Sequence, residues 1–388
     1  MDGKTTLLIT FNFPPSVGGI ETMLYHIMRN MPGKVIVMAP WVNGCDEFDL
    51  KQKFSVIRIR CGKASPSRAI KFLVRSIPLF KKLHINHIQS GNIYAALVSM
   101  VLSKVYNTHY SVYAMGMEIA IINTNLRSWL YKWLFRSVLK NASCVLSISD
   151  FTSNEVIKSG VSANKIFKIP CGIDTTTLDS FSQEKFEIFK KRVVKQYDLD
   201  GKKIILSISR LVPRKGHDLA ILAVNELLRD MPDVTYIIVG GGPEFENCKK
   251  LVKKMSLDNN IKFTGQVPDE DIVNYYYLSD LFVLPCRHIK ETSDVEGFGL
   301  VFLEANYCGR PVVGGNSGGI PDSVEHGKTG FIVDPADRKD IAQKIKLLLT
   351  NDDLRTKMGV YGRKRVIEFF NHDITVKKIM EGLSRYYS

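Results

Sequence analysis

Acidic residues are absent from one long stretch of this chain. Between Leu50 and Met117 there is no Asp or Glu, although the same stretch contains 11 Lys and Arg. Residues 1–175 together have 21 Lys+Arg against 9 Asp+Glu, whereas the rest of the 388-residue chain has 32 against 30. Such one-sided charge indicates an anionic partner, either nucleic acid or an anionic membrane surface, unless it is only a solubilising basic face.

Long hydrophobic runs are also absent. The apolar segment Ile93–Val101 is too short to cross a bilayer, and Lys104 follows it. The first residues lead directly into a strand-like run and do not resemble a signal peptide. The seven cysteines are odd in number and scattered, and no two form a Cys-x-x-Cys pair, so we expect reduced thiols and no metal site. These absences predict a cytoplasmic globular protein.

Apolar, β-branched runs alternate with amphipathic stretches along the whole chain. This alternation predicts an α/β protein, and two successive series of runs predict two doubly wound, parallel-sheet (Rossmann-like) domains facing across a cleft. The first series comprises Thr6–Phe11, Lys34–Ala39, Ser55–Ile59, Ser143–Ile148 and Ile166–Ile169. The second comprises Lys203–Ser207, Val234–Val239, Ile261–Thr264, Leu281–Leu284, Pro311–Gly314 and Gly330–Val333.

The domain boundary is predicted in a polar segment from about residue 173 to residue 202, which is poor in aliphatic runs. We expect an N-terminal domain of residues 1–175 and a C-terminal domain of residues 176–371. The last stretch, residues 372–388, has a helical pattern and is expected to pack back on the first domain.

Two glutamates lie eight positions apart in Glu296-Gly-Phe-Gly-Leu-Val-Phe-Leu-Glu304. If the glycines form a loop and Leu300 begins a helix, Glu304 lies about one turn inside that helix and Glu296 lies in front of it. The N–H groups between them then face a common point and can bind an anion. Two carboxylates can bind sugar hydroxyls and the backbone amides can bind phosphate, a combination that suits a sugar nucleotide. Alternatively, acidic residues at a helix start only complement the helix macrodipole.

Two cations follow the apolar run Ile204–Ile208, which places Arg210 and Lys215 at the carboxyl end of a strand, where doubly wound sheets bind ligands. A guanidinium binds two phosphate oxygens at once, and an ammonium adds a point charge. Gly18 and Gly19 follow the first predicted strand, where glycine lets the backbone approach a diphosphate.

A third glycine-rich segment, Gly240-Gly241-Gly242, lacks a following Lys-Ser/Thr, and two glutamates at the next helix start would repel phosphate. It predicts a tight strand-to-helix connection rather than a phosphate loop.

These motifs resemble the retaining glycosyltransferases of family 4, which have the GT-B fold, and the similarity covers nearly the whole chain. The Glu-x7-Glu motif, the Arg210/Lys215 pair and the Ser317-Gly-Gly-Ile-Pro-Asp322 turn occur in the family's order. Further similar segments are Phe263-Thr-Gly-Gln-Val267, like the family's base-binding strand end, Cys308-Gly-Arg-Pro-Val-Val313, and Pro14-Pro-Ser-Val-Gly-Gly-Ile-Glu21. Within the family, the second domain looks most similar to phosphatidylinositol mannosyltransferases.

The resemblance implies roles for the candidate residues. Arg210 and Lys215 would bind the donor diphosphate and favour its departure, in place of the metal that other transferases use, while Glu296 would hold sugar hydroxyls. No metal and no cofactor is expected. The implied donor contacts are Gly18, Gly19, Val267, Gly297, Phe298, Gly299, Leu300, Val301 and Glu304, the last on the ribose hydroxyls.

One segment departs from the family pattern. Family members often carry His-Gly-x-Glu after a first-domain strand, whereas this chain has Met115-Gly116-Met117-Glu118. Gly116 and Glu118 match and are candidate contacts to the sugar or the acceptor. Met115 cannot donate the hydrogen bond of a histidine, so another group fills that role, the donor sugar differs, or activity is reduced.

The resemblance implies a retaining hexosyltransferase that uses a nucleotide sugar, with GDP-mannose as the first expectation and a UDP-sugar as the second. The acceptor would be a hydroxyl of a lipid-linked or polysaccharide molecule. One alternative is a sugar-nucleotide hydrolase or epimerase on the same fold, which needs a general acid/base near the sugar. The other is a non-catalytic protein that binds an anionic surface or nucleic acid, although no nucleic-acid motif is recognised.

Two basic stretches, residues 68–82 and residues 127–136, mix cations with large apolar residues, among them Trp129 and Trp133. Such stretches either lie in a membrane interface or cover the sheet. Covering the sheet is favoured for residues 127–140, and both interpretations stay open for residues 68–82. We therefore expect a peripheral protein on the inner face of the membrane, attached through its basic first domain.

Overall fold

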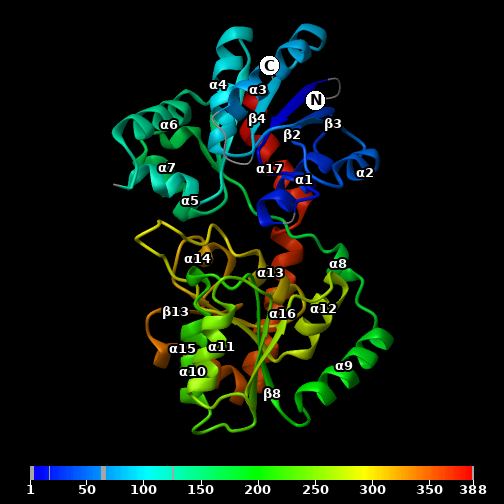
Figure 1. Ribbon diagram of the computed structural model, residues 1–388, viewed down its shortest axis with the longest axis vertical. Helices are drawn as coiled ribbons and strands as arrows, with labels where there is room; N and C mark the ends of the chain where they lie inside the picture. The colour runs from blue at the N-terminus through cyan, green and yellow to red at the C-terminus, as the bar shows by residue number, and fades with distance from the viewer. Residues whose placement is uncertain (1–3, 17, 63–66, 125, 387–388) are drawn as a thin grey trace. The chain divides into compact units, whose positions relative to one another are not determined.

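The computed structural model describes residues 4–16, 18–62, 67–124 and 126–386, so Val17 of the predicted glycine loop lies outside the described residues. The chain divides into two compact units, Met1–Gly172 with Asn371–Ser388, and Ile173–Phe370. Each unit has one sheet whose paired strands are all parallel and which helices cover (Figure 1). The predicted fold class, two doubly wound parallel-sheet domains, is confirmed.

The first unit has a seven-stranded sheet in the order β3-β2-β1-β4-β5-β6-β7. Its strands are β1 (Thr5–Ile9), β2 (Lys34–Pro40), β3 (Ser55–Ile59), β4 (His87–Ser90), β5 (His109–Ala114), β6 (Cys144–Ser147) and β7 (Ile166–Lys168). Its helices are α1 (Gly19–Asn30), α2 (Cys45–Leu50), α3 (Ser67–Lys82), α4 (Ile93–Tyr106), α5 (Met117–Ala120), α6 (Trp129–Asn141), α7 (Asp150–Lys158) and α17 (His372–Leu383), with short turns η1 (Ile121–Asn123), η2 (Ala163–Lys165) and η4 (Ser384–Tyr386).

The strand order reverses between β1 and β4, so connections from these two strands run in opposite directions. The helix α17 belongs to this unit and packs against α1; Figure 1 shows it in red beside the blue α1. Val376, Ile379 and Leu383 are its buried aliphatic residues. The Thr375 hydroxyl accepts a hydrogen bond from the Gly172 N–H at 3.1 Å, which fixes the end of the chain to this unit.

The second unit has a six-stranded sheet in the order β10-β9-β8-β11-β12-β13. Its strands are β8 (Lys203–Ile208), β9 (Val234–Val239), β10 (Ile261–Gly265), β11 (Leu281–Leu284), β12 (Val312–Gly315) and β13 (Gly330–Val333). Its helices are α8 (Thr176–Asp179), α9 (Gln183–Tyr197), α10 (His217–Leu227), α11 (Phe245–Lys254), α12 (Asp269–Leu278), α13 (Leu300–Tyr307), α14 (Ile320–Ser323), α15 (Arg338–Thr350) and α16 (Asp352–Phe369), with the turn η3 (Pro213–Lys215).

The strands of this sheet are apolar because helices cover both of its faces. All six residues of β9 are buried, as are all four of β11. The polar segment predicted as the join is largely helical and belongs to this unit: α9 packs on α12, where the rings of Phe189 and Tyr275 meet edge to face at 4.9 Å.

Candidate functional site

The two central strands of the second sheet, β8 and β11, form its switch point. They are neighbours, but the strands that follow β8 add to one side of the sheet and the strands that follow β11 add to the other. In sheets of this type, ligands bind at the carboxyl edge beside such a switch point. Lys215 follows β8 and Glu296 follows β11.

The Lys215 ammonium and the Glu296 carboxylate meet directly, with Nζ and Oε2 2.7 Å apart. Lys215 ends the turn η3, and its side chain is only 9% exposed. Gly216, the next residue, has φ 70°, and a Cβ at this position would collide with the carbonyl oxygen of Pro285. Only glycine allows the loop after β8 to lie this close to the end of β11, so the sequence Lys215-Gly216 positions the ammonium.

Arg214 is a site residue that the sequence analysis did not identify. Its Nε lies 3.3 Å from Glu296 Oε2, and its Nη1 lies 3.4 Å from the carboxylate of Asp294. Both cations thus contact the same oxygen of Glu296, and within the described part of the chain no hydrogen-bond partner is found for Oε1. The available signal was the adjacency of Arg214 and Lys215 on a single turn after a strand.

The charges of this cluster stabilise one another. Burial acts to raise the pKa of Glu296, but the nearby Lys215 and Arg214 outweigh it and hold that pKa below its ordinary value. Burial likewise acts to lower the pKa of Lys215, but Glu296 outweighs it and raises that pKa. Glu296 is therefore ionised at neutral pH, and its Oε1 can accept a hydrogen bond from a hydroxyl.

The second glutamate lies where the sequence predicted it. The helix α13 begins at Leu300, so Glu304 is about one turn inside it, and the Tyr276 hydroxyl donates a hydrogen bond to its Oε2 at 2.8 Å. Burial raises the pKa of Glu304, against the opposing effects of Tyr276 and the Lys215 charge. Glu304 follows β11 and Lys215 follows β8, so both lie at the carboxyl edge of the second sheet, where these two strands are neighbours.

The segment between the two glutamates presents backbone amides. Gly299 precedes α13 with φ 90° and ψ 60°, and no side chain caps this helix start. Phe298 is buried with its ring 5.9 Å from that of Phe370, which anchors the loop. Gly297, Leu300 and Val301 complete the segment and are partly exposed. The geometry is that of a helix N-terminus able to receive an anion.

Arg210 and Val267 are not brought into contact with the glutamate pair. Arg210 is exposed at the end of β8, and among the residues described here its guanidinium has no ion pair. Val267 lies half-buried between β10 and α12. Both are at the carboxyl edge of the sheet, so their position agrees with donor binding without testing it.

In the first unit, Gly18 and Gly19 lie at the start of α1, after β1. The Glu21 carboxylate lies against Gly18 and accepts a hydrogen bond from Asn12 Nδ2 at 2.9 Å. Asn12 in turn accepts one from Asn92 Nδ2 at 3.2 Å. This chain of hydrogen bonds links the carboxyl ends of β1 and β4, the switch point of the first sheet.

The segment after β5 that departs from the family pattern, Met115–Glu118, forms an internal hydrogen bond. The Glu118 carboxylate accepts a hydrogen bond from the Met115 N–H at 2.6 Å, and burial raises its pKa. Gly116 has φ 136°, a conformation that glycine tolerates. Met115, which stands where the family resemblance led us to expect histidine, is buried and therefore fills space.

The segment Gly240–Gly242 is a tight connection, as predicted. A Cβ on Gly240 would collide with the Ser209 carbonyl, and one on Gly242 would collide with the Leu211 carbonyl. These glycines let two loops pack closely. Across the described ranges, no three His, Cys, Asp or Glu side chains gather as ligands for a metal ion.

Comparisons with known proteins agree with this geometry. Residues 17–177 match the family "Glycosyltransferase Family 4", and residues 189–365 match "Glycosyl transferases group 1". The chain is 30% identical over 97% of both lengths to the GDP-mannose-dependent alpha-(1-6)-phosphatidylinositol monomannoside mannosyltransferase of Mycobacterium tuberculosis. It is 30% identical over 92% of both lengths to the enzyme with the same name in Mycolicibacterium smegmatis.

Solved structures share the fold. The crystal structure of a glycosyltransferase from Rickettsia africae matches with a TM-score of 0.82 and 21% identity, covering 99% of this chain and 98% of that one. The Anabaena protein Alr3699/HepE, in complex with UDP and glucose, matches with a TM-score of 0.80 and 20% identity, covering 98% of this chain and 100% of that one.

Proposed function

The chain belongs to the family 4 glycosyltransferases of the GT-B fold, and from this premise we propose that it moves a hexose, with retention, from a nucleotide donor to a hydroxyl of a lipid-linked or polysaccharide acceptor. GDP-mannose is the first donor expected, because the relatives of 30% identity are named as GDP-mannose-dependent. A UDP-sugar is the second. Membership of this family disfavours both the hydrolase or epimerase and the non-catalytic binding protein.

The Lys215–Glu296 pair at the switch point of the second sheet is the observation that carries this proposal. An ammonium has three N–H donors, so Lys215 can contact a phosphate oxygen while it keeps its bond to Glu296. Glu296, with Oε2 occupied by cations, offers Oε1 to a sugar hydroxyl. One residue of the pair thus faces the diphosphate and the other faces the sugar that is transferred.

The other proposed donor contacts are assigned from the position of each residue at the carboxyl edge of the second sheet. Arg210, exposed at the same strand end, would close on the diphosphate when the donor arrives and, with Lys215, stabilise the negative charge that grows as the sugar leaves. This is the charge that a resident metal would otherwise neutralise, so we propose a metal-independent reaction. Glu304 would hold the ribose hydroxyls, and the amides at the start of α13 would contact sugar and phosphate.

Lipid acceptors would require the enzyme to work at a membrane surface. No helix among the described residues is long and apolar enough to cross a bilayer. We therefore propose peripheral association with the inner face of the membrane, in keeping with relatives whose names specify phosphatidylinositol-based acceptors.

A panel of nucleotide sugars, tested for thermal stabilisation of the protein, examines the donor site. We expect one donor class, GDP-mannose first, to raise the Tm of the wild type and to lose most of this effect in Lys215→Ala and Glu304→Ala. Lys346→Ala is the matched control, because it removes only a surface ion pair with Asp230. Equal stabilisation of all four proteins would show that the donor binds elsewhere.

A further inference from the structure

One loop of the second unit carries the cations of the candidate site. It follows β8 and leads into α10, which begins at His217. Within it lie three cations: Arg210, Arg214 and Lys215. The side chains at the two ends of this loop meet, because Ser209 Oγ lies 2.9 Å from His217 Nε2. We call this contact the Ser209–His217 bond.

His217 extends the contact into the core of the second unit. Its side chain belongs to a residue only 2% exposed, and its Nδ1 lies 3.4 Å from the Tyr236 hydroxyl on β9. That hydroxyl lies 2.7 Å from Ser207 Oγ on β8, and the Ser207 hydroxyl donates a hydrogen bond to the carbonyl oxygen of Val283 on β11. Ser207 and Tyr236 are fully buried. The far end of the loop is thus tied to three neighbouring strands of the sheet.

The positions of the hydrogens follow from the inner end of this chain of hydrogen bonds. A carbonyl oxygen can only accept, so the single hydroxyl hydrogen of Ser207 goes to Val283. Ser207 therefore accepts from the Tyr236 hydroxyl, which in turn accepts from Nδ1–H of His217. A neutral imidazole that carries its hydrogen on Nδ1 has a bare Nε2, and this nitrogen accepts the hydroxyl hydrogen of Ser209.

The ionisation of both rings agrees with this assignment. Burial, with a smaller effect of the Lys215 charge, lowers the pKa of His217 to about 3, so the imidazole is neutral at neutral pH. Burial raises the pKa of Tyr236, so its hydroxyl keeps its hydrogen. A neutral ring has one donor and one acceptor nitrogen, which the chain of hydrogen bonds requires, and it adds no positive charge to a loop with three cations.

The Ser209–His217 bond joins the ends of the loop, whereas backbone contacts hold its middle. The Arg287 N–H donates to the Arg214 carbonyl oxygen at 2.8 Å. Ser209 has a second acceptor within reach, the Arg210 carbonyl oxygen at 3.3 Å, but the His217 nitrogen is closer. The side chains of Ser209 and His217 therefore set where the loop starts and ends.

We propose that Ser209 and His217 are positioning residues, whose bond fixes the loop after β8 in the conformation that binds the donor diphosphate. The inference rests on the function proposed above, which assigns Arg210 and Lys215 to that diphosphate. Neither Ser209 nor His217 has to touch the donor. Without their bond, the loop is ordered only when the donor arrives, and this ordering costs affinity. A purely structural role would affect stability and leave phosphate affinity unchanged.

Calorimetric titration of the full-length protein with inorganic pyrophosphate tests the proposal, because pyrophosphate probes the cations without base or sugar. Ser209→Ala should weaken pyrophosphate binding by about tenfold. Its Tm should change little, because Ser209 is half-buried and water can replace its hydroxyl. Lys215→Ala should abolish binding, which shows that the probe reports on this site.

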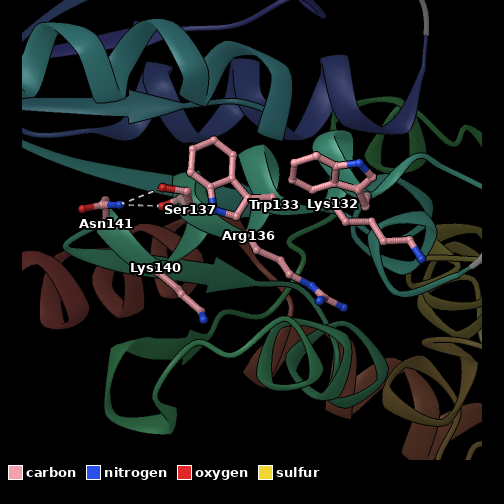
Figure 2. A pocket seen from close by; sticks show the side chains of 7 residues that line it. Lys132, Trp133, Arg136, Ser137, Lys140 and Asn141 are labelled. Atoms are coloured by element: carbon pink, nitrogen blue, oxygen red, sulfur yellow. Dashed lines mark hydrogen bonds between the residues drawn. The ribbon is translucent and has the colours of Figure 1, made fainter.

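The matched control is Ser137→Ala on α6 of the first unit. Ser137 is half-buried like Ser209, and its hydroxyl accepts a hydrogen bond from Asn141 Nδ2 at 3.2 Å within a single helix (Figure 2). This variant should bind pyrophosphate like the wild type.

Two substitutions of His217 separate the Ser209–His217 bond from the packing of the imidazole ring. The amide of glutamine reaches the position of Nε2, so His217→Gln keeps an acceptor for Ser209. The shorter asparagine reaches only the position of Nδ1, so His217→Asn keeps the contact with Tyr236 alone. Although both variants lose the ring, we expect affinity for pyrophosphate close to that of the wild type in His217→Gln and about tenfold weaker in His217→Asn.

The hydrogen on His217 gives an independent readout. In protein labelled with ¹⁵N in its eight histidines, the signal of His217 is the one missing from His217→Gln. A long-range ¹H–¹⁵N correlation spectrum should show a protonated Nδ1 and a bare Nε2, unchanged between about pH 5 and pH 8. Tyr236→Phe should abolish this preference for Nδ1.

Equal affinity for pyrophosphate in the wild type, Ser209→Ala and His217→Asn would overturn the proposal, as would a hydrogen on Nε2 of His217 or a glutamine variant no better than the asparagine variant. Failure of the donor site has a different signature: the wild type would not bind pyrophosphate, or would bind it no better than Lys215→Ala does. That result would overturn the proposed function and this inference together.

Discussion

Arg214 is the residue whose role emerges only from the three-dimensional arrangement. It contacts Glu296 and Asp294, so the function proposed above assigns the donor phosphates to Lys215 and Arg210 rather than to Arg214. We interpret it as a positioning residue that keeps Glu296 ionised and oriented. The sequence analysis preferred Arg210 because Arg210 and Lys215 form the pair that resembles the family motif. Arg214 follows the same strand, and the spacing of the two arginines does not say which one turns toward the acid.

Arg214→Gln should therefore change pH dependence as well as affinity. Losing this cation raises the pKa of Glu296, so the acid limb of the pH–kcat/KM profile should move to higher pH, and the KM for donor should rise by about tenfold. A steady-state profile of the variant beside that of Arg229→Gln measures both effects. Among the described residues, Arg229 is ion-paired with Glu226, three positions earlier on the surface. A lower KM with an unmoved acid limb would contradict the positioning role.

The ion pair of Glu296 with Lys215 contributes to the stability of the fold in a defined pH window. The pKa of Glu296 in the folded state lies below its ordinary value of 4.5, so its contribution is fully present above about pH 4.5 and is lost as the pH falls through the lower folded value. Denaturant unfolding between pH 3 and pH 7, on the scale of these pKa values, should show less acid destabilisation in Glu296→Gln than in the wild type. Parallel curves for the two proteins would argue against a stabilising pair.

Glu304 differs from Glu296, because its ionised carboxylate is expected to aid donor binding while it destabilises the fold. Its pKa is raised by burial, so the ionised carboxylate destabilises the folded protein at neutral pH. Glu304→Gln keeps an oxygen for the Tyr276 hydroxyl and removes the charge. We expect an unchanged or higher Tm by calorimetry, with donor affinity about ten- to a hundredfold weaker. Tyr276→Phe is the companion variant, which should lower the Tm.

At the scale of elements, the start of α13 depends on one glycine. Gly299 has φ 90°, and a Cβ there would lie 2.7 Å from the Phe302 ring and 3.0 Å from Ile320 Cδ1. Gly309 has a similar φ of 71° but open space around its Cβ position, so it is a matched control. Gly309→Ala should cost about 1–2 kcal/mol of unfolding free energy from backbone strain alone, and Gly299→Ala should cost more.

The same comparison reports on function, because displacement of the α13 start moves the amides in front of Glu304. Donor affinity, measured by calorimetric titration, should fall in Gly299→Ala and stay unchanged in Gly309→Ala. Equal unfolding free energies and equal affinities for the two variants would mean that the loop before α13 adapts and does not need to be glycine.

The strands show what a sequence pattern can and cannot reveal. All six strands of the second sheet were predicted within a residue or two, because buried parallel strands are nearly continuous apolar runs. β4 was missed because three of its four buried residues are polar: His87, Gln89 and Ser90 are hydrogen-bonded to Ser111, Tyr113 and Ser99. In β4, hydrogen bonds to side chains of β5 and α4 allow polar residues to be buried, and no local sequence pattern predicts these partners.

At the scale of the whole molecule, the chain ends in the unit where it began. Removing residues 371–388 would take away the buried Val376, Ile379 and Leu383 of α17, roughly 5–9 kcal/mol of apolar burial. Hydrogen exchange should then show lost protection in α1, with β8 and β9 of the second unit unaffected. Lys378→Ala, which breaks only a surface pair with Glu381, is the control. Uniform loss of protection in both units would contradict this division.

The general location of the candidate site could be predicted, because its residues follow apolar runs that the sequence identifies as strands. The Lys215–Glu296 contact and the helix start at Leu300 follow from that order. The contacts of Arg214 with Glu296 and Asp294 depend on packing between segments that are distant in the chain, which the sequence does not display.

The central claim is that Glu296 faces the transferred sugar while Glu304 faces the ribose. Calorimetric titration of GDP-mannose and of GDP into the wild type, Glu296→Gln and Glu304→Gln tests it most directly. The account predicts that Glu296→Gln weakens GDP-mannose by about tenfold and leaves GDP unchanged, whereas Glu304→Gln weakens both. Equal weakening of GDP and GDP-mannose in Glu296→Gln, or wild-type affinities in both variants, would contradict it.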